Sequence, residues 1–243
     1  MISEQGNHIS INGMGSANGG TYENVEINGH GKVNGGLQCR NLTTNGRSRL
    51  VGEVRADYCQ VNGSSIIEGS ANVNQLVVHG SSTVNGSFQG QEIRVDGHTR
   101  FNGQVTVDRV DIRGSLSVGG KMDAETLACN GKIRVDGLLN VEKLELTLHG
   151  SSEAREIGGE TIQVKRSFMG SGLGKVVKDF IGISDRLTAN VIEGDHVVLE
   201  ATRAHVVRGN YVTIGPDCEI GLVEYKTELQ RDPGSSVREE RRI

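Results

Sequence analysis

The side chains that could carry out chemistry are few and scattered along the chain. No Cys-x-x-Cys pair is present, and the four cysteines stand at Cys39, Cys59, Cys129 and Cys218. Zinc sites and redox disulfides usually depend on closely spaced cysteines, so these residues are interpreted as buried free thiols. His30 and His98 have no repeated carboxylate beside them. The sequence therefore predicts no catalytic, metal-binding or cofactor-binding residue, no cofactor and no enzymatic activity.

One group of carboxylates could bind a cation or act as an acid–base pair. Its members occupy the same corner of a repeat in four copies, at Asp57, Asp108, Glu125 and Glu142. The other three copies carry a basic or amide side chain there, at Arg40, Asn74 and Gln91. Calcium and magnesium need several oxygen ligands in one place. A solvated corner is therefore the favoured interpretation.

A glycine-rich stretch that ends at Lys175 resembles a phosphate-binding loop. The match fails, because Met169 stands where that loop needs glycine and Val176 stands where it needs Ser or Thr. The favoured interpretation of residues 168–184 is a short helix or lid over an open edge of the fold. The alternative is a segment that binds a membrane surface or a partner protein. Its candidate residues are Leu173, Lys175, Val176, Val177, Lys178, Phe180 and Ile181.

Composition narrows the class of protein. The 243 residues include 35 glycines but only 2 prolines, and the formal net charge is -4. A large nucleic-acid-binding surface needs a clustered basic excess, so no nucleic acid partner is expected. The first residues, MISEQGNHIS, lack the basic and apolar regions of a signal peptide, and no apolar run is long enough for a membrane span. A cytoplasmic location is therefore expected.

Glycine recurs every 17 residues. One series lies at Gly29, Gly46, Gly63, Gly80, Gly97, Gly114 and Gly131, and a second follows it by six residues, from Gly35 to Gly137. Between them, apolar residues fall in three pairs per copy, and the two members of each pair are separated by one residue. That spacing is the period of a strand. Glycine and asparagine suit the corners because they tolerate positive φ.

These patterns predict an all-β fold, a parallel β-helix or β-solenoid with three short strands per 17-residue coil. The expected layout is an N-terminal tail at 1–8, a main β-helix at 9–166 and the irregular or helical insert at 167–185. A second, small β block at 186–228 and a disordered charged tail at 229–243 complete it. Independent hairpins are disfavoured, because they do not require a fixed period.

The repeat resembles a known family in two stretches. These are VNGSSIIEGSANVNQLVVHGSSTVNGSFQG and NVIEGDHVVLEATRAHVVRGNYVTIGPDCEIGLVEY. Both are similar to the bactofilins, bacterial cytoskeletal proteins, over roughly residues 9–226. The resemblance implies a right-handed β-helix that polymerises end to end without nucleotide. The insert and the second β block go beyond a minimal core of that family.

The leading hypothesis is therefore a non-enzymatic cytoskeletal scaffold that forms filaments and serves cell shape, motility or the localisation of partners. Its partner would be itself, and then the inner face of the membrane or other cytoskeletal or motility proteins. Unpaired strand edges at the ends of a solenoid are templates for another copy. The predicted contact residues are therefore Ile9, Ile11, Val223 and Tyr225. The alternatives are a β-solenoid enzyme, either an acyltransferase or carbohydrate-active, and a monomeric adaptor.

Overall fold

The computed structural model describes residues 2–5, 7–167 and 185–243. All regular structure in these residues is β-strand, and they contain no helix. The chain divides into two compact units, residues 1–121 and residues 122–243. The predicted helical or irregular insert at 167–185 falls almost entirely outside the described residues.

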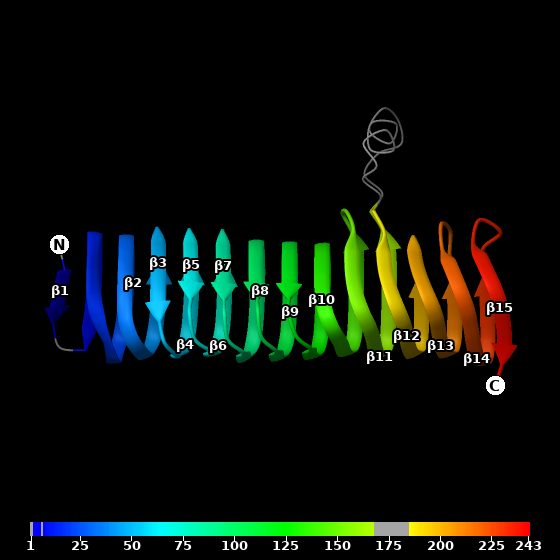
Figure 1. Cartoon of the computed structure of the whole chain (residues 1–243), viewed down its shortest axis with the longest axis horizontal. Coiled ribbons are helices and arrows are strands. Elements are labelled where there is room, and N and C mark those ends of the chain that lie inside the picture. The colour runs from blue at the N-terminus through cyan, green and yellow to red at the C-terminus, as the bar shows by residue number, and fades with distance from the viewer. Residues whose placement is uncertain (1, 6, 168–184) are drawn as a thin grey trace, which may run out of the picture. The chain divides into compact units, whose positions relative to one another are not determined.

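The first unit is a β-solenoid of parallel, stacked coils. Its strands are β1 (Ile2–Gln5), β2 (His8–Thr44), β3 (Arg47–Val51), β4 (Val54–Val61), β5 (Ser64–Ile67), β6 (Ala71–Val78), β7 (Ser81–Val84), β8 (Phe88–Phe101) and β9 (Val105–Val118). From His30 onward each coil pairs with the next one at an offset of 17 residues, as in His30 with Arg47 and Leu37 with Val54. The coils lie side by side in chain order, so β4 pairs with β2 and β6, and β5 pairs with β3 and β7 (Figure 1). The predicted fold class is confirmed.

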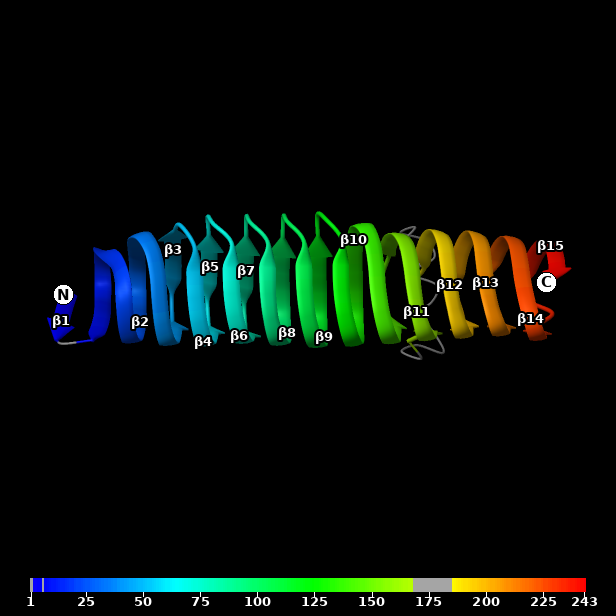
Figure 2. The same ribbon diagram turned by 90° about the horizontal axis from the view of Figure 1, so that it is seen from below.

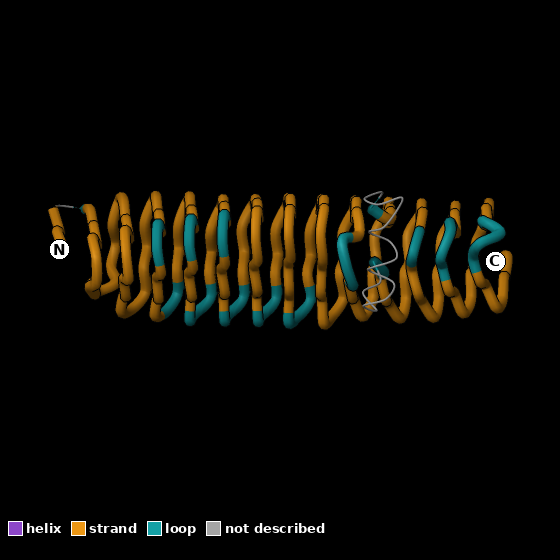
Figure 3. Tube along the Cα trace, turned by 90° about the horizontal axis from the view of Figure 1, so that it is seen from above, coloured by secondary structure: helices purple, strands orange, loops and turns teal. Residues whose placement is uncertain are grey.

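The core of this unit is made by the three predicted inward pairs of each coil. In one coil they are Ser48 with Leu50, Val54 with Ala56, and Cys59 with Val61, and all six side chains are buried. The structure has fewer strand breaks than predicted, because β4 runs straight through the corner at Asp57 and Tyr58. Only the glycine corners interrupt the strands, and their short loops line up from coil to coil (Figure 3).

The second unit is also a parallel β-solenoid. It contains β10 (Met122–Leu148), β11 (Ser152–Arg166), β12 (Leu187–Leu199), β13 (Thr202–Ile214), β14 (Glu219–Arg231) and β15 (Ser236–Arg242). β11 pairs directly with β12. Residues 168–184, which follow β11 and precede β12 in the sequence, therefore connect two neighbouring strands. The coil length then falls, since Leu187 pairs with Thr202 and Arg203 pairs with Glu219. Residues 186–228 therefore continue the stack of β11 and do not form a separate block.

Both predicted tails are strands, which corrects the sequence interpretation. Residues 2–5 form β1, which pairs antiparallel with residues 8–11 of β2. Residues 229–243 contain the end of β14 and all of β15, which pair in parallel, and the two strands lie side by side (Figure 2). Each of them is ordered by backbone pairing with one neighbouring strand, although few of their side chains are buried. High charge alone was therefore a poor guide to disorder.

Candidate functional site

The N-terminal edge of the first unit is half covered. β1 pairs with His8–Ile11, and the side chains of Ile9 and Ile11 are fully buried. These two residues were predicted to contact another copy. The structure instead places them in the core, beneath the chain's own first strand. A contact that uses their side chains would require β1 to leave.

The rest of the first coil, residues 12–22, forms what we call the N-terminal open edge. Its sequence is NGMGSANGGTY, without a single charged residue. Among the described residues no strand pairs with its outer side. Ala17 is its only buried hydrophobic side chain, whereas Met14 is 82% exposed. A strand edge without charges is a template for pairing with another chain.

The C-terminal edge of the second unit has the opposite character. β15 is SVREERR, so five of its seven residues are charged. It covers the half of β14 that contains Val223 and Tyr225, where Val223 pairs with Glu240 and Tyr225 with Arg242. Val223 is fully buried. The predicted contact residues at this end are therefore one strand away from the edge, because the charged tail is ordered.

Charged side chains also occupy positions that belong to the core in the preceding coils. Arg231 pairs with the buried Ile214, and Glu240 pairs with the buried Val223. Arg231 and Glu240 form an ion pair of 3.1 Å with each other. The Arg231 guanidinium also donates to the carbonyl oxygen of Ser235 at 3.1 Å. Together these groups form a polar cap on the last coil, which sequence analysis missed because it assigned no register to the tail.

Ladders of polar side chains run along the outside of both units. In the first unit each asparagine amide donates to the side-chain oxygen of the asparagine one coil earlier, at 2.7 to 3.0 Å, through Asn12, Asn28, Asn45 and Asn62. Stacked amides of this kind stabilise parallel in-register strands. The 17-residue period places Asn28, Asn45 and Asn62 in line, so the sequence already contained the signal for these three, whereas Asn12 precedes Asn28 by 16 residues.

In the second unit the corresponding ladder is ionic. Glu193, Arg208, Glu224 and Arg241 alternate in sign, with 3.6, 2.6 and 3.2 Å between successive partners. The pKa of Glu224 is lowered, chiefly by the hydrogen bond from Arg208 and also by the charge of Arg241. The pKa of Glu219 is lowered in the same way by Arg203 and then by Arg186. These carboxylates are held ionised as structural partners of arginine.

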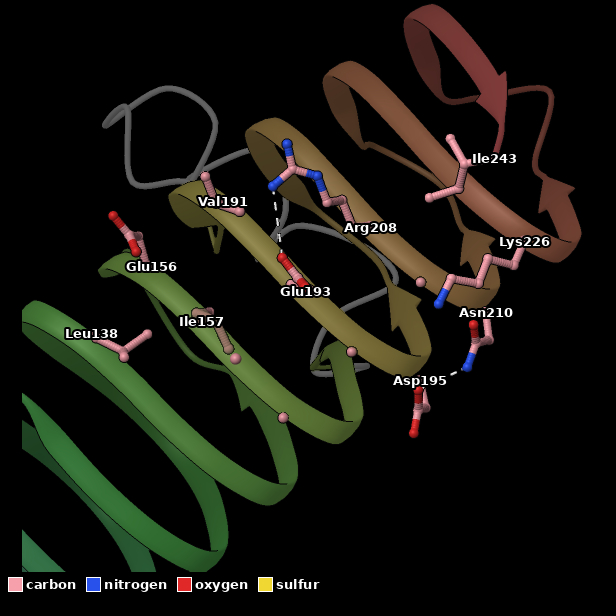
Figure 4. Close-up of a pocket in the computed structure, with 14 residues that line it drawn as sticks. Leu138, Glu156, Ile157, Val191, Glu193, Asp195, Arg208, Asn210, Lys226 and Ile243 are labelled. Atoms are coloured by element: carbon pink, nitrogen blue, oxygen red, sulfur yellow. Dashed lines mark hydrogen bonds and ion pairs between the residues drawn. The ribbon is translucent and has the colours of Figure 1, made fainter.

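An open groove of about 480 Å³ lies beside this ladder. Its floor contains Gly159, Gly194 and Gly209, which pair in successive coils. Three of the charged groups around it have partners, since Glu193 pairs with Arg208 and Asn210 donates to Asp195 at 2.8 Å (Figure 4). No three His, Cys, Asp or Glu residues gather closely enough for a metal ion anywhere in the described residues.

The four cysteines are buried, as predicted, and none of them forms a disulfide bond. Burial raises the pKa of the Cys39 and Cys218 thiols to about 11 and that of the Cys59 thiol to about 12. Such thiols remain protonated at neutral pH, and thiols rather than thiolates are poor nucleophiles. Their role is to fill the core.

The segment predicted to bind a membrane or partner lies outside the described residues. This applies to all seven of its candidates: Leu173, Lys175, Val176, Val177, Lys178, Phe180 and Ile181. Within the described part of the chain, no helix has the length and apolarity that crossing a membrane requires.

Comparison with known proteins gives two relatives, both from Bacillus subtilis (strain 168). The uncharacterised protein YhbF is 44% identical over 97 residues, which is 39% of this chain and 37% of that protein. The uncharacterised protein YhbE is 43% identical over 88 residues, which is 36% of this chain and 35% of that protein. The chain thus spans just over a third of the length of these relatives. No family model matches it, and no solved structure is significantly similar.

Proposed function

We propose that this protein is a non-enzymatic cytoskeletal scaffold of the cytoplasm. Its copies assemble end to end into filaments without nucleotide, and the filaments lie at the inner face of the membrane. There they serve cell shape, motility or the localisation of other cytoskeletal or motility proteins. The proposal agrees with the resemblance to bactofilins, and it draws its physical support from the ends of the two solenoid units.

The N-terminal open edge is the observation that carries this proposal. Unprotected edges are a hazard that soluble β-proteins usually manage with charges, prolines or covering segments. Residues 12–22 have no charged or proline residue, and β1 covers only the neighbouring stretch. Another copy can therefore add its backbone to this edge, and such pairing needs no energy source.

Growth beyond a pair requires a second contact. At the C-terminal end β15 covers only the first half of β14, and residues 226–231 have no strand on their outer side among the described residues. This stretch, KTELQR, carries three charged residues, which restrict pairing at this edge without covering its backbone. One contact at each end is what an open filament needs.

Assembly is tested with purified full-length protein by sedimentation and negative-stain imaging, without nucleotide. We expect filaments and a concentration-dependent pellet. The substitutions Ser16→Lys and Asn18→Lys place charges on the N-terminal open edge, where both side chains are exposed, and should keep the protein in the supernatant. The matched control is Gln38→Lys with Gln89→Lys, which adds the same charge at exposed positions of inner coils. A wild-type protein that remains monomeric at high concentration would refute the proposal.

A further inference from the structure

One face of the first unit is basic. Two outward ladders run along it, and each contributes one residue per coil at the 17-residue offset. We call this surface the basic face. Its residues are His30, Arg47, Ser64, Ser81, His98 and Ser115 in one ladder, and Lys32, Arg49, Ile66, Thr83, Arg100 and Ser117 in the other.

Charge on the basic face is strongly biased. Its twelve positions include four Lys or Arg residues and two histidines, but no Asp or Glu. Residues 1–121 as a whole contain ten Lys or Arg and ten Asp or Glu. The remainder of this unit therefore has six basic and ten acidic residues. The positive charge is concentrated on one face of a unit that is neutral in total.

The basic face also places like charges next to one another. Lys32 is in register with Arg49, and His30 is in register with Arg47. Like charges opposite each other destabilise a sheet, and elsewhere this unit pairs opposites, as in Glu92 with Arg109. Neither Lys32 nor Arg47 forms an ion pair with any described residue. This placement of like charges lowers the stability of the sheet and leaves Lys32 and Arg47 without an ion-pair partner. An anionic partner would supply the missing negative charge.

Exposed apolar side chains accompany these cations. Met14, which is 82% exposed, lines the same shallow groove as His30, Arg47 and Ser64. Ile66, which is 40% exposed, lies one coil beyond Arg49. Neither this groove nor the one beside it, around Lys32 and Arg49, has an acidic residue in its lining. The combination of cations with exposed Met and Ile on a pleated surface matches the interface of a bilayer with anionic lipids.

We propose that the basic face docks the protein onto an anionic membrane surface. Lys32, Arg47 and Arg100 meet the phosphate headgroups, and Met14 and Ile66 enter the interfacial layer. Arg49, which is ion-paired with Glu68, lies beside them on the same face. This deepens the proposed function, on which it rests for its cellular setting, by naming the surface that contacts the membrane. It does not depend on residues 168–184.

The direct test is flotation of the full-length protein with lipid vesicles at low and high salt. Vesicles of phosphatidylcholine alone are compared with vesicles that also contain phosphatidylglycerol. We expect binding only to the anionic vesicles, and weaker binding at high salt because salt screens exposed charges. Each Lys or Arg near an anionic surface strengthens binding roughly fivefold. Lys32→Gln with Arg47→Gln should therefore weaken binding by about an order of magnitude or more.

Control variants distinguish an effect of the basic face from an effect of the protein's net charge. Arg40→Gln with Arg55→Gln removes two exposed cations from other faces, each next to a glutamate at 3.3 and 2.9 Å. This variant should bind nearly as well as the wild type, and both variants should unfold at similar temperatures. Met14→Ser should weaken binding to vesicles but not to soluble polyglutamate. Equal binding to neutral vesicles, or equal loss in both charge variants, would overturn the docking proposal.

Two further outcomes are informative. The protein could bind polyglutamate tightly and vesicles weakly, with no effect of Met14→Ser on polyglutamate binding. That result would show that the partner of the basic face is an acidic polymer and not a membrane. Sedimentation without vesicles reports on assembly in the same samples. If the protein forms filaments that do not bind vesicles, the membrane-docking proposal is wrong and the scaffold proposal stands. If it stays monomeric but binds vesicles, the scaffold proposal is wrong and the docking proposal stands.

Discussion

At the scale of single residues, glycine is required at some corners because there is no room for a side chain, and not because the backbone has a positive φ. Gly46 and Gly63 do not have positive φ. A methyl group on Gly63 would nevertheless lie 2.1 Å from the carbonyl oxygen of Gly46, and one on Gly46 would lie 2.2 Å from that of Gly29. The backbones of successive coils approach closely at this corner. The period identifies these glycines correctly, but tolerance of positive φ is only part of the reason for them.

Gly63→Ala should therefore destabilise the protein. The added methyl group meets backbone atoms that cannot move aside, and overpacking of this kind costs about 1–3 kcal/mol. Gly36→Ala is the matched control, because its methyl group would be 3.7 Å from the nearest neighbouring atom, the Glu53 carbonyl oxygen. Chemical denaturation should show a clear loss for Gly63→Ala and a small change for Gly36→Ala. Equal losses would contradict the role assigned to close backbone approach.

Cys59 should make the protein less stable in alkali. Its pKa is raised to about 12 by burial, above the value of the unfolded thiol near 9. The stability from the buried neutral thiol is complete below about pH 9 and is lost as the pH rises toward 12, by up to about 1.4 kcal/mol per pH unit. The free energy of unfolding of the Cys59→Val variant should fall less steeply above pH 9. Parallel slopes for the two proteins would show that this thiol does not titrate as described.

At the scale of elements, the two units differ in how far sequence predicts their side-chain contacts. The fixed period of the first unit gives the register directly, so the Asn28–Asn45–Asn62 ladder could be predicted. In the second unit the offset between paired residues is 19 for Arg134 with Glu153, 15 for Leu187 with Thr202 and 17 for Glu219 with Ser236. Without a constant period, the ion pairs of Glu224 could not be derived from spacing.

Glu224→Gln should lower the unfolding temperature at neutral pH. Glu224 lies between Arg208 and Arg241, and its lowered pKa means that the ionised form is favoured by folding. That contribution is present above the unfolded pKa of a carboxyl group and disappears as the pH falls through the lowered folded value. The difference from wild type should therefore vanish in acid and shrink in high salt.

Glu160→Gln is the control for that experiment. It makes the same chemical change at an exposed residue of β11, and among the described residues Glu160 has no ion pair. Thermal unfolding followed from neutral to acidic pH should leave this variant close to wild type throughout. A pH-independent effect of Glu224→Gln would mean that packing, and not charge, accounts for the change.

At the scale of the whole molecule, the ends of the chain were the least predictable part. Inward positions were recognised by apolar alternation, which residues 229–243 lack. Edge strands often carry charged residues in place of apolar ones, because charges discourage unwanted pairing with other chains. The same composition therefore indicates either a disordered tail or a protected edge. Only the pairing of β15 with β14 decides between them.

Replacing one charge of the polar cap should create a new contact. Glu240→Val would extend the inward ladder of Val207 and Val223 to the last strand and remove the ion-pair partner of Arg231. The exposed end then presents an apolar cross-section, which we expect to stack on another copy. Glu239→Val is the control, since it changes charge and composition identically but at the outward position next to Leu222.

The measurement is sedimentation velocity over a range of protein concentrations. It is made in the background of Ser16→Lys and Asn18→Lys, so that the N-terminal open edge cannot contribute. Glu240→Val should sediment as dimers at concentrations where Glu239→Val remains monomeric, because burial of apolar surface drives the association. If both variants associate equally, general surface hydrophobicity is the cause. If neither associates, the polar cap does not limit contact through the C-terminal end, and assembly there is controlled by residues 226–231 instead.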